Sequence, residues 1–297
     1  MNNDNRQNST KTNINWYPGH MAKTKREVEK ALPLIDIVYE LIDARIPFSS
    51  KIADISSLIK NKTKVLIMTK KDLCDLSETG EWIKYYEQKG YKVLLLNLND
   101  NNDYKKIITL TNELVNEINQ KRHEKGLKAK EVKALVIGIP NVGKSTLINK
   151  MAGKKVANVG NTPGITKINT WLKTKHNILL LDTPGILWPK FENETVALNL
   201  ASMTAIKNDV LPVDEVAYYI LTRLDKYYPH LLKMRYNLDE LGDDLELSYE
   251  KIGHLMGAVN KGQEVDYTKV SNKIINDIKN EYIKGITFDR KEDLDER

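Results

Sequence analysis

A nine-residue segment, GIPNVGKST, constrains the fold of this chain more than any other part of its sequence. It spans residues 138–146 and matches G-x-x-x-x-G-K-[ST], a pattern whose glycines let backbone N–H groups turn inward around a phosphate. The apolar run ALVI precedes it and a helix-compatible stretch follows. A chance glycine-rich turn would not need these flanking elements, so the sequence predicts a phosphate-binding loop in an α/β fold.

Each position of this loop has an expected role. We expect Lys144 to bridge the β- and γ-phosphates of a bound nucleotide and the Ser145 hydroxyl to be a Mg²⁺ ligand. The other expected nucleotide contacts in the loop are Gly138, Asn141, Val142, Gly143 and Thr146.

A second phosphate-side motif follows in the segment LLLDTPG. Asp182 lies 37 residues after Ser145, at the end of an apolar run, where a carboxylate can hold Mg²⁺. The N–H of Gly185 is placed to reach the γ-phosphate. Between the two motifs, Thr166 can close over Mg²⁺ and the γ-phosphate as a switch residue, although an ordinary loop threonine is the alternative.

The segment TKKD, residues 69–72, is the candidate base-reading motif. Guanine presents N1–H and N2–H₂ donors on one edge, and the Asp72 carboxylate can accept both, which discriminates strongly against adenine. The aliphatic stem of Lys70 can lie along the base, while Thr69 and Lys71 complete the motif. The segment directly follows the run VLIM, and bases bind at the carboxyl ends of such strands.

The chain alternates short apolar runs with helix-compatible stretches, which predicts a doubly wound, mostly parallel sheet. The expected strands are residues 35–42, 65–69, 93–96, 134–137 and 178–181, and the expected helices are 52–60, 80–88, 103–124 and one opening at Lys144. After Phe191 the pattern becomes helical. Two series at helical spacing predict a small all-α region: Val216, Ile220, Leu224 and Tyr228, then Val270, Ile274, Ile278 and Tyr282.

Composition limits the class of protein. Residues 1–13 are polar and are expected to be a disordered tail. A single cysteine, Cys74, suits a reducing compartment such as the cytoplasm, and neither a membrane span nor a signal peptide is expected. Residues 1–192 carry an excess of twelve positive charges and residues 193–297 an excess of six negative charges. The basic excess, including the connector KRHEKGLKAKEVK at 121–133, is either a nucleic-acid footprint or a solvated surface.

Several motifs together make the chain resemble the circularly permuted GTPases of the YlqF/YawG family over nearly everything after residue 14. They are WYPGHMAK at 16–23, DARIP at 43–47, TKKD, the phosphate loop, PGIT at 163–166 and DTPGILWPKF at 182–191. In ordinary GTPases the phosphate loop comes first, whereas here the base motif precedes it. The resemblance implies a GTPase domain at 14–191, a helical C-terminal domain at 192–297, and GTP or GDP with Mg²⁺ as ligands.

The chain departs from common GTPase patterns at two positions. The family's base motif normally begins with Asn, and Thr69 lacks one amide contact. Many small GTPases orient the attacking water with a Gln after the D-x-x-G glycine, but Ile186 occupies that position. The resemblance assigns the water-orienting role to His20, whose alternative role is to pin the N-terminal segment. The second guanine loop falls near residues 97–99 and is degenerate.

The resemblance has further implications. It implies K⁺ coordination by Asn141, which can equally be a turn residue. Asp43 and Arg45 of DARIP are expected to form an ion pair or to shape the surface. The implied function is late assembly of the large (50S) ribosomal subunit, with binding to the pre-ribosome and its rRNA in the GTP state and release on hydrolysis. We expect a monomer with no DNA or membrane partner.

Two alternatives remain for the function. One is another translational or RNA-modifying GTPase, and the other is a nucleotide-gated scaffold with little turnover, which the Ile186 substitution favours. In either case the residues after Gly185 lead through Trp188 into the helical region. Nucleotide state can therefore reorient that region.

Overall fold

The computed structural model describes residues 26–52, 59, 62–154, 171–174, 178–182, 193–206 and 211–295. The expected tail at 1–13, most of the expected helix at 52–60, His20, Thr166 and Gly185 lie outside these ranges. Among the described helices, none is long and apolar enough to cross a membrane.

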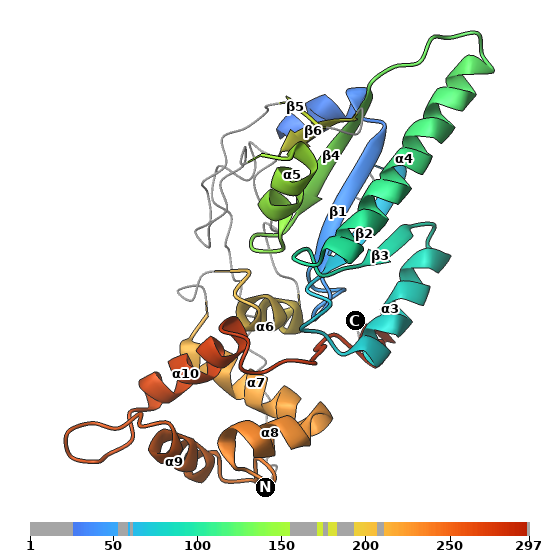
Figure 1. Cartoon of the computed structure of the whole chain (residues 1–297). Coiled ribbons are helices and arrows are strands. Elements are labelled where there is room, and N and C mark those ends of the chain that lie inside the picture. The colour runs from blue at the N-terminus through green and yellow to red at the C-terminus, as the bar shows by residue number, and fades with distance from the viewer. Residues whose placement is uncertain are drawn as a thin grey trace, which may run out of the picture.

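Within the described ranges, six strands form one sheet in the order β3-β2-β1-β4-β6-β5 (Figure 1). Every neighbouring pair is parallel except β5 and β6, which are antiparallel. The strands are β1 (Ile37–Asp43), β2 (Thr63–Thr69), β3 (Lys92–Leu95), β4 (Val132–Gly138), β5 (Trp171–Lys173) and β6 (Ile178–Asp182). The predicted mostly parallel sheet is confirmed, and β5 is an addition to the five expected strands.

Helices cover both faces of this sheet, which explains why its central strands are apolar on both sides. All seven residues of β1 are buried. Helices α4 (Asn101–His123) and α5 (Lys144–Ala152) pack on one face, and α3 (Leu76–Gln88) packs on the other with η1 (Leu32–Leu34). The Tyr39 hydroxyl of β1 lies 2.7 Å from Thr111 Oγ1 of α4. Successive residues of β1 thus contact opposite helical layers.

Aspartate caps set where two of these helices begin. Asp75 accepts hydrogen bonds from the backbone N–H groups of Ser77 and Glu78, so α3 begins at Leu76 rather than at residue 80 as predicted. Asp100 accepts from Asn102 N at the start of α4, two residues before the predicted start. The apolar pattern located both helices, and the caps determined their first turns.

The rest of the described chain is helical, as predicted. Its helices are α6 (Glu194–Ser202), α7 (Val213–Tyr227), α8 (Pro229–Tyr236), α9 (Leu245–Leu255), α10 (Tyr267–Lys279) and α11 (Glu292–Asp295). The series from Val216 to Tyr228 is buried, as expected. The second series was wrong at its last member: α10 ends at Lys279, and Tyr282 lies beyond it with 66% of its surface exposed.

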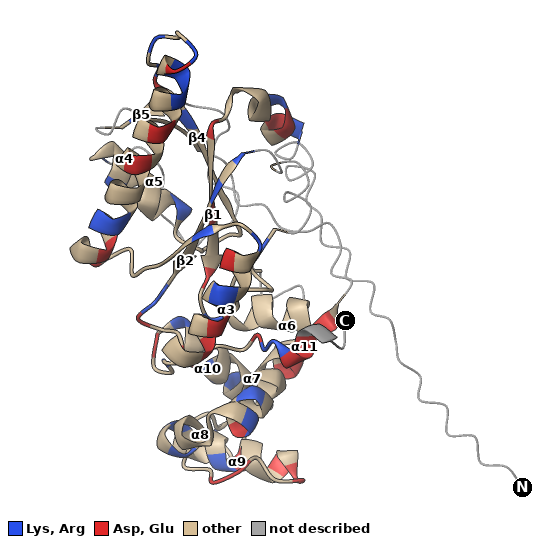
Figure 2. Ribbon diagram, turned by 90° about the vertical axis from the view of Figure 1, so that its right-hand side faces the viewer, with Lys and Arg blue, Asp and Glu red and all other residues tan. Residues whose placement is uncertain are grey.

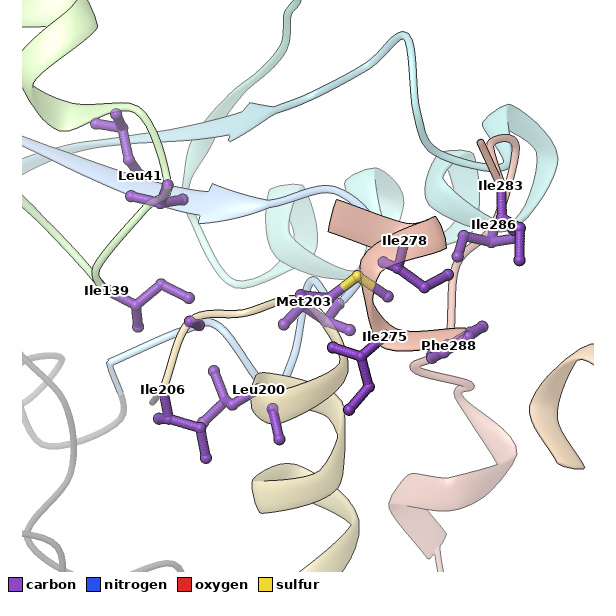
Figure 3. Packing of buried hydrophobic residues seen from close by; sticks show 14 of the residues in the cluster. Leu41, Ile139, Leu200, Met203, Ile206, Ile275, Ile278, Ile283, Ile286 and Phe288 are labelled. Atoms are coloured by element: carbon purple, nitrogen blue, oxygen red, sulfur yellow. The ribbon is translucent and has the colours of Figure 1, made fainter. Parts of the chain in front are cut away.

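One apolar cluster connects the sheet with the helical region. It runs from the sheet and phosphate loop through α6 to α10 and the segment after it, with Met203, Ile275 and Ile278 at the junction (Figure 3). The edge of the sheet at which β1 and β4 end is therefore packed directly against the helical region.

A short segment after α10 returns to the sheet. We call residues 285–290 the C-terminal strap. Gly285 N and Ile286 N both donate to Leu73 O, and Phe288 N donates to Arg45 O at 2.7 Å. In Figure 1 this segment runs from α10 back to the N-terminal end of α3. The strap thus ties the helical region to the turns that follow β1 and β2.

Candidate nucleotide site

The phosphate loop has the backbone that its glycines predict. β4 ends at Gly138 and α5 begins at Lys144, with Gly143 as its N-cap at φ 101°. A Cβ at Gly138 would lie 2.5 Å from Leu41 O, and a Cβ at Gly143 would lie 2.7 Å from the Leu98 Cδ1 atom. A backbone oxygen therefore excludes larger residues at Gly138, and the positive φ strains them at Gly143. No side chain caps the first turn of α5. This open helix N-terminus is a suitable cradle for phosphate.

The phosphate-loop lysine lies against its own loop. Lys144 is only 8% exposed, and its Nζ donates to Ile139 O at 2.7 Å. Ser145 and Thr146 follow in the first turn and are half-buried. An ammonium held by a carbonyl here can exchange that acceptor for phosphate oxygens when a nucleotide enters the loop.

The base motif begins where β2 ends. Thr69 is its buried first residue, Lys70 has a left-handed backbone at φ 61°, and Asp72 is exposed. Lys71 instead reaches toward α4, with its Nζ 3.4 Å from Asp103 Oδ2. Only part of the four-residue motif is thus directed toward the phosphate loop.

Thr69 bridges the base motif and the phosphate loop. Its Oγ1 lies 2.8 Å from Val142 O and 3.1 Å from Ile42 O. The hydroxyl proton can donate to either carbonyl, and the shorter distance is to the phosphate loop. A threonine at this position therefore retains a direct connection between the two motifs.

Asp43 at the end of β1 joins the DARIP segment to the base motif. The Arg45 guanidinium donates to both carboxylate oxygens of Asp43, at 3.0 and 2.8 Å, and Lys70 Nζ lies 2.8 Å from Asp43 Oδ2. Burial would raise the pKa of Asp43, but Arg45 and Lys70 outweigh it and hold that pKa well below its usual range. Burial lowers the pKa of Lys70, and Asp43 only partly opposes the shift. The expected ion pair between Asp43 and Arg45 is confirmed, and it also fixes Lys70.

The two motifs face one cavity of about 540 Å³. From the predicted site it is lined by Thr69, Lys70, Asp72, Asn141, Val142, Gly143 and Thr146. Asp72 and the phosphate loop therefore share a cavity although 66 residues separate Asp72 from Gly138. The residues that form its walls do not include Lys71, Gly138, Lys144 or Ser145.

Other lining residues were given little weight or no role at the site from the sequence. Asn97, Leu98 and Asn99 contribute to the wall, at the degenerate guanine loop that the sequence left with little weight. Arg45 lines the cavity too, and its place directly after β1 in DARIP was a usable signal. Residues from the helical region, around Thr204 and the end of α10, had no signal in the sequence.

Asn141 connects the phosphate loop to the helical region. Its φ is 59°, a left-handed conformation that asparagine tolerates in turns. Its Nδ2 donates to Thr204 O at 2.9 Å, just after α6. The turn role expected as one alternative is therefore present, and the amide nitrogen faces the helical region.

The phosphate-side motif begins beside the phosphate loop. β6 ends at Asp182, which pairs with Val136 of β4 in the parallel register. The carboxyl ends of β4 and β6 are thus neighbours. Asp182 is the last residue of β6, and Ser145 lies in the first turn of α5, which follows β4 through the phosphate loop. A carboxylate and a hydroxyl are oxygen donors that suit Mg²⁺. Thr166, Gly185, Ile186 and His20 lie outside the described residues.

Comparison with known proteins gives consistent matches. A family model described as "50S ribosome-binding GTPase" matches residues 133–240. The chain is 43% identical over 281 residues to ribosome biogenesis GTPase A of Bacillus licheniformis, covering 95% of this chain and 99% of that protein. It is 44% identical to ribosome biogenesis GTPase A of Bacillus pumilus, covering 94% and 99%. The crystal structure of GNP-bound YlqF from T. maritima shares the fold, with a TM-score of 0.63 at 19% identity over 90% of this chain and 98% of that chain.

Proposed function

This chain belongs to the ribosome biogenesis GTPase A family, and from that membership we propose how its cavity holds and hydrolyses GTP. The chain is a GTPase that acts in the assembly of the large ribosomal subunit. The observation that carries the proposal is the shared cavity, in which Asp72 of the base motif and Gly143 of the phosphate loop face the same space. Asp72 accepts from the guanine donors, and the phosphate-loop N–H groups hold the phosphates.

The phosphate end of the site would also hold the metal. Ser145 and Asp182 would be Mg²⁺ ligands, joined by Thr166 when the γ-phosphate is present. Bound Mg²⁺ neutralises charge that develops on the β- and γ-phosphate oxygens. Lys144 contributes to the same neutralisation after leaving Ile139 O, and Gly185 N–H contacts the γ-phosphate.

We propose His20 as the residue that orients the attacking water. The side chain of Ile186, which follows the D-x-x-G glycine, cannot accept a hydrogen bond, whereas a neutral imidazole can accept from water near pH 7. His20→Ala is expected to bind GTP normally while turnover falls by at least ~10-fold. Unchanged turnover would remove His20 from the mechanism.

A monovalent cation is the proposed partner of the Asn141 side-chain oxygen. The Asn141 amide nitrogen is bound to Thr204 O, which leaves the oxygen as the atom of that amide able to coordinate K⁺. Such a cation would neutralise charge beside the phosphates. Turnover should then be faster in potassium chloride than in sodium chloride at equal ionic strength, and equal rates would contradict this role.

The proposed partner is the large ribosomal subunit with its rRNA, bound in the GTP state by a monomer in the cytoplasm. The connector at 121–133 supports RNA contact, because its lysines and arginine run from the last turn of α4 to the start of β4, and Figure 2 shows blue segments at that end of α4. Such side chains gain affinity by replacing counterions at RNA phosphates. The domain division at residue 191 remains a prediction of the same proposal.

Nucleotide-dependent co-sedimentation with purified 50S subunits tests this function. The wild-type protein should pellet with subunits in a non-hydrolysable GTP analogue and far less in GDP. Lys144→Ala should lose the difference, whereas Lys154→Ala, which removes an exposed lysine just after α5, should behave as wild type. Equal pelleting in both nucleotides, or stimulation of turnover by tRNA instead of subunits, would refute the proposal.

A further inference from the structure

One wall of the nucleotide cavity comes from the last turn of α10. Ile275, Ile278 and Lys279 of α10 line it together with Glu281, which lies just beyond the helix end, and residues of the base motif line the same cavity. Ile275 and Ile278 are almost fully buried, while Lys279 and Glu281 are exposed at the rim. The helical region thus contributes both apolar and charged side chains to a site that otherwise belongs to the sheet.

The turn that carries Glu281 is held in a fixed conformation. Glu281 has a left-handed backbone at φ 62°, which is uncommon for a residue with a side chain. Tyr282 N donates to Asp277 O at 2.9 Å. The buried Asp277 carboxylate is in turn held by Arg235 at 2.6 and 2.8 Å and by the Tyr236 hydroxyl at 2.9 Å. Glu281 N also donates to Ile278 O at 3.3 Å, so the left-handed residue and these two bonds form a common closure of a helix C-terminus, which fixes the direction in which the chain leaves α10.

The C-terminal strap fixes this turn against the base motif. Gly285 N and Ile286 N donate to Leu73 O at 2.8 and 3.2 Å, and Leu73 directly follows Asp72. Ile278 and Ile286 also lie in the same apolar group (Figure 3). The position of Glu281 relative to Asp72 is therefore set by direct backbone hydrogen bonds only a few residues from each.

The carboxylates around the cavity have different tasks. Asp43 is fully engaged by Arg45 and Lys70, and Asp72 is assigned to the base. Glu281 has a weak surface partner, Lys284, at 3.6 Å. Its carboxylate also attracts the Lys70 ammonium at longer range, and its oxygens remain able to accept from a ligand donor.

We propose that Glu281 accepts hydrogen bonds from the ribose hydroxyls of the bound guanine nucleotide. This inference rests on the proposed function, in which Asp72 takes the base and the phosphate loop takes the phosphates. The ribose joins these two parts, and its adjacent hydroxyls are donors that neither motif satisfies. Two carboxylate oxygens can accept from two adjacent hydroxyls, as acidic residues do for the ribose in other nucleotide sites. The nucleotide would then bridge the sheet and the helical region.

Calorimetric titration with sugar-modified nucleotides tests this contact. The proteins are wild type, Glu281→Gly, which suits the left-handed backbone, Glu281→Gln, and the control Glu250→Gln, which changes an exposed glutamate on α9. The ligands are GDP, ADP and 2′,3′-dideoxy-GDP. Wild type and the control should bind GDP ~10-fold more tightly than the dideoxy form, because hydrogen bonds to a charged group contribute this much. Glu281→Gly should bind both forms equally and with the weaker affinity, and Glu281→Gln should lie between.

The outcomes separate the two proposals. Equal affinity of wild type for GDP and dideoxy-GDP would overturn the ribose contact alone, as would full discrimination by Glu281→Gly. Tighter GDP binding by Glu281→Gly would also overturn it, since the glutamate would then obstruct the site. Wild-type binding of ADP as tight as that of GDP would instead overturn the guanine assignment of Asp72, and the ribose contact with it.

Discussion

Replacing Asp289 by alanine is expected to lower the free energy of unfolding by about 4 kcal/mol. Asp289 lies in the C-terminal strap and is fully buried. Its Oδ2 accepts from Phe48 N at 2.8 Å and Ser49 N at 2.7 Å, and its Oδ1 accepts from Ser49 Oγ at 2.6 Å and from Asn199 Nδ2 at 2.9 Å. One carboxylate thus joins the turn after β1, α6 and the strap.

The magnitude follows from what alanine leaves behind. Each hydrogen bond to a charged group contributes about 1.5–3 kcal/mol. The contributions are not additive, because Asn199 can still donate to Ser49 Oγ at 3.0 Å. The two backbone N–H groups of residues 48 and 49 would lose this acceptor inside the protein, which places the total near the cost of breaking a buried charge network. Asp289→Asn should cost less, about 2 kcal/mol, because one oxygen remains to accept from the backbone pair.

Urea denaturation followed by far-UV circular dichroism measures these values. The urea concentration at the midpoint should fall in the order wild type, Asp289→Asn, Asp289→Ala. The slope of the free energy of unfolding against urea concentration should be similar in all three proteins. Asp239→Ala is the matched control, because Asp239 is 84% exposed and pairs with Lys233 at the surface, so its loss should cost less than about 1 kcal/mol. A cost below about 1 kcal/mol for Asp289→Ala would refute the view that the strap is a structural link.

Three further perturbations test the site and the core. Thr69→Val should weaken GDP binding by ~5-fold, since it removes the hydroxyl 2.8 Å from Val142 O, and Thr69→Ser should restore the affinity. Equal GDP affinity of Thr69→Val and wild type in calorimetry would refute the role of Thr69 as a bridge. Asp72→Asn should weaken GDP binding by ~100-fold and favour xanthosine diphosphate, whose extra carbonyl accepts from the new amide. If competition binding showed that the variant still prefers GDP as strongly as the wild type does, the base assignment would be contradicted. Burial raises the pKa of Tyr39 to about 12 from 10.0, so between these values the unfolded chain ionises first and stability should fall by about 1.4 kcal/mol per pH unit. For Tyr39→Phe, the free energy of unfolding, measured by urea denaturation from pH 9 to 12, should fall less steeply with pH than for the wild type. At neutral pH this variant should be about 1 kcal/mol less stable, because the hydrogen bond with Thr111 is lost. The same pH slope in both proteins would reject this explanation.

The sheet could be predicted because its buried strands are continuous apolar runs. β5 could not, since its three residues form no run and are defined by pairing with β6. α8 was also missed, because Pro229 starts a new helix only two residues after the end of α7, within one helical pattern. Local sequence periodicity thus located the core elements but not the breaks that depend on tertiary contacts.

The two halves of the nucleotide site differed in how well the sequence revealed them. The phosphate loop carries its own signature, so its strand, turn and helix were predictable. The base motif needed its position after an apolar strand and the family resemblance, because a K-x-D triplet alone is common. The wall from α10 and the contacts of Asp289 with residues 48 and 49 had no local signal, since the partners are far apart in the sequence. Such pairings are decided by packing of the whole chain.

The position of the strap in the sequence has a consequence for protein synthesis. A ribosome translates residues 285–290 only after all six strands and the helices from α6 to α10. The turn at Phe48 and Ser49 is synthesised early, and its partner Asp289 is added only near the end of translation. Nascent chains can therefore fold the sheet but cannot close this junction, which would leave the exposed turn a target for chaperones or proteases until translation passes residue 289. A premature stop codon just before that position would release a protein with every nucleotide motif present and its closing contact missing.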